Sequence, residues 1–129
     1  MLLSRAAEVA LAALPRLDPR GPSAAGRGAK ALAEETSLPA PFLAKVLQRL
    51  VERGILRSKR GRSGGFVLGR PAAEITVADV VLALEGHEEL ESAFPRFAGP
   101  VGRLLSPVRT RVFDVFRNTT VADLRKELP

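Results

Sequence analysis

Apolar residues recur at every third or fourth position in several stretches of the chain, which is the spacing of amphipathic helices. The clearest of these stretches begins at Pro41, where a missing backbone N–H costs nothing because the first turn of a helix leaves it unbonded. Gly54 follows as a residue suited to a left-handed helix end. The pattern predicts helices over Met1–Leu14, Ala29–Glu35, the stretch from Pro41 to Gly54, and Thr76 to about Glu85.

Between Gly54 and Thr76 the spacing changes from helical to strand-like. Two short strand-like runs, Ile55–Lys59 and Phe66–Gly69, flank the turn Arg60–Gly65. Three glycines in that turn are typical of a hairpin tip that needs positive φ. We therefore expect a small antiparallel hairpin, after a long loop over Pro15–Gly28 and a tight connection at Thr36–Pro39.

The C-terminal third carries an apolar stripe with nearly heptad spacing from Val101 to Phe116. Pro107 lies inside it, so a helix either begins there with Ser106 as its cap or kinks there. A Thr-x-x-Asp capping pattern occurs at Thr76 and again at Thr120, where it predicts a short final helix. The fold class expected is mainly α with one small hairpin.

The composition of the 129-residue chain removes several function classes. It has no cysteine and one histidine, which excludes disulfides, thiolate-held metals and a multi-histidine metal site. No run approaches the roughly 20 apolar residues of a membrane span. Glu8 interrupts the apolar N-terminus, so we expect a structural helix of a cytoplasmic protein, with no membrane partner, rather than a targeting segment. No signature of an enzyme active site is present, and no catalytic residue is assigned.

The positive charge is concentrated in one part of the chain. The net charge is +6, yet the window 42–70 alone holds eight basic residues against the single acid Glu52. Each feature by itself has an ordinary explanation, since basic helix faces are commonly just solvated. A helix, a tight turn, a second helix and a basic hairpin, in that order, are typical of a winged helix-turn-helix that binds double-stranded DNA.

The candidate DNA-binding residues follow from this arrangement. The polar face of the second helix would enter the major groove, where glutamine reads adenine and basic side chains read guanine or contact phosphate. The arginines at the hairpin tip would reach the backbone or the minor groove. The set is Lys45, Gln48, Arg49, Arg57, Lys59, Arg60, Arg62 and Ser63.

Several segments resemble the Rrf2 family of winged helix-turn-helix transcriptional regulators. They are Leu3–Leu11, Pro41–Leu50, Gly54–Ser58, Arg60–Leu68, Ile75–Val81 with Leu84–Gly86, and Asn118–Leu124. The resemblance implies a homodimeric repressor or activator on a partly palindromic operator, and we expect a repressor. It divides the chain into a DNA-binding domain (1–86) and an effector-loop and dimerisation region (87–129) of the same compact chain.

The resemblance also implies that a helix from about Val101 to Arg117 crosses its partner to form the dimer. The apolar stripe supports this independently, because it is more apolar than a lone C-terminal helix needs, although packing on its own domain is the alternative. The candidate dimerisation residues are Leu104, Leu105, Val108, Val112, Val115 and Phe116.

The chain departs from the family in two respects. Many members hold an iron–sulfur cluster through three cysteines in the segment matching about Gly86–Leu105, and here that segment has none. We therefore expect no cofactor, and a small molecule or a protein as effector. His87 with Glu88, Glu89 and Glu91 is interpreted as a solvated acidic turn rather than a metal site.

The second departure is the start of the recognition helix, where Pro39, Ala40 and Pro41 stand in place of polar residues. Base recognition would then depend on few side chains and more of the affinity on phosphate contacts. This leaves a second hypothesis open: a protein-interaction module on the same fold, with only weak nonspecific DNA binding.

Overall fold

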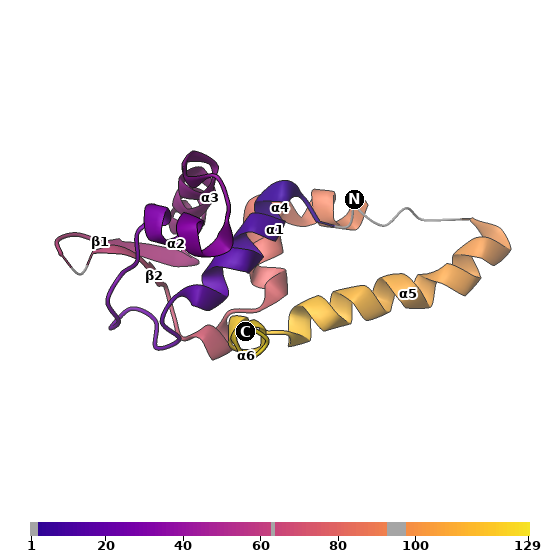
Figure 1. Ribbon diagram of the computed structural model, residues 1–129. Helices are drawn as coiled ribbons and strands as arrows, with labels where there is room; N and C mark the ends of the chain where they lie inside the picture. The colour runs from indigo at the N-terminus through magenta and orange to yellow at the C-terminus, as the bar shows by residue number, and fades with distance from the viewer. Residues whose placement is uncertain (1–2, 63, 93–97) are drawn as a thin grey trace.

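A helical body carries a hairpin at one end and a long helix at the other (Figure 1). The computed structural model describes residues 3–62, 64–92 and 98–129, without the side chains of residues 87–92. Its elements are α1 (Arg5–Ala13), η1 (Leu14–Arg16), α2 (Ala29–Thr36), α3 (Ala40–Glu52), β1 (Leu56–Lys59), β2 (Gly65–Leu68), η2 (Ala72–Glu74), α4 (Val77–Ser92), α5 (Gly99–Asn118) and α6 (Val121–Lys126). The mainly α fold with one hairpin is confirmed.

The core lies where α1 packs against α3 and α4, with α2 packed on α3. Helix α1 buries Ala7, Ala10 and Ala13, whose small side chains let neighbouring helices approach closely. Its first turn is capped by the hydroxyl of Ser4, which accepts from the backbone N–H of Ala7 at 3.1 Å.

Helix α3 forms where the apolar spacing predicted it. Leu43, Leu47 and Leu50 are fully buried on one side, and Pro41 lies in the first turn. Ser37 ends α2 in the left-handed conformation with φ of 58°, and Gly54 follows α3 with φ of 80°. These two residues turn the chain into and out of α3.

The hairpin is extended by the long loop that precedes α2. Strands β1 and β2 pair in the register Leu56↔Leu68 and Lys59↔Gly65. Arg27 then forms an antiparallel bridge to Phe66, with N–H to carbonyl distances of 3.0 and 2.8 Å in the two directions. The predicted loop over Pro15–Gly28 is therefore bonded to the hairpin, and only its start is helical, in η1.

The two Thr-x-x-Asp capping patterns form capping boxes and lie side by side. In each, the threonine hydroxyl accepts from the aspartate backbone N–H while the carboxylate accepts from the threonine backbone N–H. Thr76 and Thr120 are also joined by an antiparallel bridge. The bridge holds α6 against the body, where Val121 enters the core that the N-terminal helices form.

Helix α4 contains a break at the glycine that the sequence placed after Glu85. Gly86 has φ of 78° and ψ of 171°, so helical geometry stops there and resumes over 87–92. Helix α5 runs from Gly99 through Pro107 to Asn118, so the alternative of a helix that begins at Pro107 is wrong. Proline is accommodated within this helix although it removes a backbone donor. None of the described helices is long and apolar enough to cross a bilayer.

Glycine at position 26 is required by the contact between the loop and the hairpin. A Cβ there would lie 2.7 Å from the carbonyl carbon of Gly64, whereas a Cβ at Gly28 would meet nothing within 4 Å. We expect Gly26→Ala to lower the free energy of unfolding by about 1–3 kcal/mol, because backbone must move. Gly28→Ala is the matched control and is expected to stay within about 0.5 kcal/mol. Urea denaturation at one protein concentration measures both, and equal losses would contradict the packing described.

Candidate nucleic-acid interface

The burial of one face of α3 turns the opposite face to solvent. Lys45 and Gln48 lie one turn apart on that exposed face. Glu52, the only acid of the basic window, follows Gln48 one turn later and is also exposed. The face thus presents one cation and one amide near the middle of the helix and a carboxylate at its end.

Arg49 lies at the side of this face and forms a hydrogen bond within the protein. Its Nη2 donates to the backbone carbonyl of Leu84 at 2.6 Å. The residue is exposed overall, but this bond holds its guanidinium against the part of α4 that precedes the break at Gly86. The structure thus separates Arg49 from Lys45 and Gln48, with which the sequence pattern grouped it.

The basic residues of the hairpin also fall into two groups, those exposed to solvent and one that is bonded within the protein. Arg57, Arg60 and Arg62 are exposed, whereas Lys59 is half-buried and its Nζ donates to the carbonyl of Ala24 in the preceding loop. Ser63, which the sequence placed in the interface, lies outside the described residues. In Figure 1 the hairpin and α3 lie at the same end of the body, away from α5.

Among the described residues, few of these basic side chains form an ion pair with a carboxylate. Within the described residues, ion pairs involve Arg5, Arg16, Arg20, Arg27, Arg70 and Arg117. Of the eight basic residues in the window 42–70, only Arg70 is among them, 2.9 Å from Asp79. A surface of like charges without carboxylate partners favours a polyanionic partner.

The apolar stripe of α5 lies at the other end of the molecule. Leu104 is 77% exposed, and Leu105, Val108 and Val115 are each more than 40% exposed. Val101 is 49% exposed and extends the stripe toward the start of the helix. Val112 and Phe116 are half-buried, and Phe116 packs against the core of its own domain. A contiguous apolar face of this kind marks an interaction surface.

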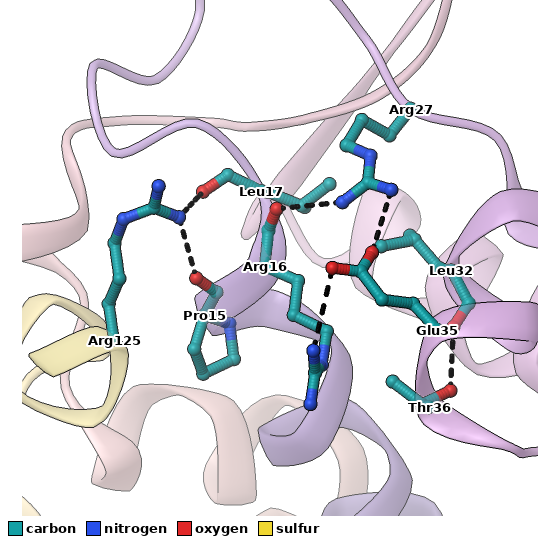
Figure 2. A network of polar contacts seen from close by, with 8 residues as sticks. All are labelled: Pro15, Arg16, Leu17, Arg27, Leu32, Glu35, Thr36 and Arg125. Carbon is teal, nitrogen blue, oxygen red and sulfur yellow. Dashed lines mark hydrogen bonds and ion pairs between the residues drawn. The ribbon is translucent and has the colours of Figure 1, made fainter. Parts of the chain in front are cut away.

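A cluster of arginines that sequence reasoning missed lies where η1, α2 and α6 meet (Figure 2). Arg27 is held to Glu35 by an Nη2–Oε2 distance of 2.7 Å, and Arg16 reaches the other oxygen of Glu35 at 3.5 Å. The hydrogen bond from Arg27 is the main cause of a lowered pKa at Glu35. Arg125 donates to the carbonyls of Pro15 and Leu17. These residues lie far apart in the sequence and share no motif, so no pattern could have found them.

The described residues contain no group of three or more His, Cys, Asp or Glu side chains that could hold a metal ion. The side chains of His87, Glu88, Glu89 and Glu91 lie outside the described residues.

A helix-turn-helix with an exposed polar face, followed by a basic hairpin, defines a winged-helix DNA-binding protein. Residues 3–127 match the Rrf2 family, which is described as iron-dependent transcriptional regulators. The chain therefore belongs to the Rrf2 family and is a DNA-binding transcriptional regulator, in a family that is not enzymatic.

Relatives agree with this assignment. A Mycobacterium tuberculosis protein named as an HTH-type transcriptional regulator is 32% identical over 133 residues, which cover 96% of this chain and 81% of that protein. The structure of CymR, the global cysteine regulator of Bacillus subtilis, superposes with a TM-score of 0.83 at 25% identity and covers 100% of this chain and 99% of that one. IscR of T. potens shares the fold, with a TM-score of 0.77 at 24% identity over 98% of this chain and 88% of that one.

The contact of Arg49 with α4 leads to a prediction about stability. We expect Arg49→Ala to lower the free energy of unfolding by about 1–2 kcal/mol, because the carbonyl of Leu84 loses a charged donor. Lys45→Ala on the same helix is expected to change it by less than about 0.5 kcal/mol. Chemical denaturation of the two variants makes the comparison. If both variants had the free energy of unfolding of the unaltered protein, Arg49 would be grouped with the solvent-facing residues instead.

Proposed function

We propose that the protein is a repressor that binds a partly palindromic operator as a homodimer, without an iron–sulfur cluster. The observation that carries the proposal is the unpaired positive charge on α3 and the hairpin, at the end of the molecule away from the apolar stripe of α5. The protein acts in the cytoplasm, where chromosomal DNA is found. Residues 1–86 bind the DNA, and residues 87–129 provide the dimer contact and the response to an effector.

In this proposal, α3 enters the major groove. Lys45 and Gln48 contact base edges, while the exposed residues of the hairpin, Arg57, Arg60 and Arg62, contact phosphates or the minor groove, together with Ser63. Arg49 and Lys59 take part mainly by holding α3 and the hairpin in place, since both donate to backbone carbonyls of the protein. With so few base-reading side chains, phosphate contacts supply most of the affinity.

The partner proposed for the α5 stripe is a second copy of this chain. Leu104, Leu105, Val108 and Val115 repeat along one side of a 20-residue helix, and no residue of that helix is buried within its own chain. Two such helices packed against each other would cover both stripes by one symmetric contact. Val112 and Phe116 complete the contact where α5 meets the body. A twofold axis at α5 would place the two α3 helices on two half-sites, as a palindrome requires.

The iron dependence that describes the family does not extend to cluster chemistry in this chain. An iron–sulfur cluster held by thiolates needs cysteines, and the chain contains none. A small molecule or a partner protein is therefore proposed as the effector.

Two substitutions separate phosphate contact from base reading. We expect Arg62→Ala to weaken binding to all duplexes and to reduce the slope of log affinity against log salt by about 1 per protomer, or about 2 for the homodimer. Gln48→Ala should chiefly reduce discrimination between the operator and other sequences, by about 1–3 kcal/mol per symmetric contact. Lys126→Ala, an exposed cation on α6, is the control and should change neither.

The measurement is fluorescence anisotropy over a salt series, with duplexes recovered by selecting bound fragments from the native genome. A recovered palindrome supports the proposal. Fragments without a shared sequence, together with equal effects of Arg62→Ala and Gln48→Ala on every duplex, would instead indicate the protein-interaction module with nonspecific DNA binding.

The dimer proposal is tested on α5. Leu104→Glu puts a charge into the apolar stripe and is expected to convert the dimer to a monomer at micromolar concentration, because an unpaired charge would be buried. Thr110→Glu, on the opposite side of the same helix and exposed, should leave the dimer intact. Sedimentation velocity distinguishes the species. Dissociation by both variants, or by neither, would exclude the stripe as the contact.

A further inference from the structure

A cleft of about 400 Å³ opens between η1, the residues just before and at the end of α2, and the C-terminal segment. Its lining residues are Arg16, Arg27, Glu35, Arg125, Leu128 and Pro129. Figure 2 shows the guanidiniums of Arg16 and Arg27 on either side of the Glu35 carboxylate, with Arg125 beyond Pro15 and Leu17. The volume lies within the range of about 300–1,000 Å³ that small-molecule sites occupy.

The charges lining the cleft are unbalanced. Three guanidiniums line the cleft together with one carboxylate side chain, that of Glu35. Arg27 forms the shorter ion pair with it, at 2.7 Å, whereas Arg16 approaches only to 3.5 Å. Arg125 makes hydrogen bonds to backbone carbonyls and brings no carboxylate into the cleft. The side chains that line the cleft therefore carry a positive excess, which Asp18, near Arg125 but outside the lining, offsets only in part.

Arg16 also has a buried donor without an acceptor. Its Nε is buried and has no hydrogen-bond partner within the described residues. Leaving a buried donor unsatisfied is unfavourable, and an acceptor that reached it would remove that cost. The side chain of Arg16 is only 23% exposed. A small solute that enters the cleft can contact it, whereas the bulky backbone of a duplex cannot.

We propose that this arginine cleft is a binding site for a small anion that presents carboxylate or phosphate oxygens. The planar fork of a guanidinium binds such oxygens in pairs, so Arg16 and Arg125 supply the anchoring donors. Glu35 competes with the ligand for Arg16 and Arg27. The short apolar surface of Leu128 and Pro129 suits an organic anion with a small hydrocarbon portion.

Occupancy of the cleft acts on the hairpin through Arg27. The backbone N–H and carbonyl of Arg27 pair with Phe66 in β2, while its guanidinium lines the cleft and donates to the carbonyl of Arg16 at 3.2 Å. An anion that draws the guanidinium of Arg27 away from Glu35 would therefore displace a residue whose backbone is bonded directly to the hairpin. An effect of the anion on DNA affinity rests on the proposed DNA binding by the hairpin, whereas anion binding itself does not.

Binding is tested on the purified full chain without DNA, by isothermal titration with sodium phosphate and, separately, sodium succinate, at an ionic strength held constant with sodium chloride. We expect saturable binding of at least one probe, weakened at least tenfold by Arg16→Gln. Glu35→Gln removes the competing carboxylate and should strengthen binding at least threefold, which a purely structural role of the cluster would not produce. Arg20→Gln is the control, since Arg20 pairs with Asp18 outside the cleft.

The preferred probe identifies the anion chemistry. Heat that does not saturate, or equal losses in Arg16→Gln and Arg20→Gln, would overturn the proposal, as would unchanged affinity in Glu35→Gln with folding verified by circular dichroism. In the same buffers, saturating anion should shift the affinity for a fluorescent duplex at least threefold in the unaltered protein and not in Arg16→Gln. If Arg16→Gln weakens duplex binding without altering phosphate or succinate affinity, the cleft serves the DNA backbone and the anion site is wrong.

Discussion

The packing of the leucine face of α3 is the constraint on which the rest of the interface depends. Leu43, Leu47 and Leu50 are removed from water completely, at an energetic gain of about 1.5–3 kcal/mol for each side chain. With that face buried, the helix can present Lys45 and Gln48 only to solvent. The strand β1 begins four residues after α3 ends, so the same packing positions the root of the hairpin relative to the exposed face.

Two antiparallel backbone bridges complete the arrangement that side-chain packing begins. The pairing of Arg27 with Phe66 ties the wing to the loop after α1, and the pairing of Thr76 with Thr120 ties the start of α4 to the segment that follows α5. Arg27, which lines the arginine cleft, is thus bonded through its backbone to the hairpin, and the segment that follows the long helix is bonded to the residues at the start of α4. The exposed apolar stripe of α5 and the exposed polar face of α3 thus lie at opposite ends of the molecule and are both connected to the same helical body.

Sequence patterns were informative where one local property decides the structure. The spacing of apolar residues located α3, the turn glycines located the hairpin, and the Thr-x-x-Asp patterns located two helix starts, because each depends on residues within a few positions. They were less informative where a partner is distant. Arg49 and Lys59 have the same charge as Lys45 and Arg62, yet each bonds to a carbonyl 35 positions away in the chain. Pro107 likewise left two alternatives, and the structure shows a helix that begins earlier, at Gly99.

The amino-acid sequence by itself determined the helical class with its hairpin, the concentration of positive charge in one window, the apolar stripe and the absence of any thiolate ligand, since these are properties of composition and short-range periodicity. Only the tertiary structure decided which cations remain without an internal partner, that the two capping boxes lie together, and that Arg16 and Arg27 meet at Glu35. The physical reason is that such contacts arise from the packing of segments that are distant along the chain. A local sequence pattern does not indicate which distant carbonyl or carboxylate a side chain will contact.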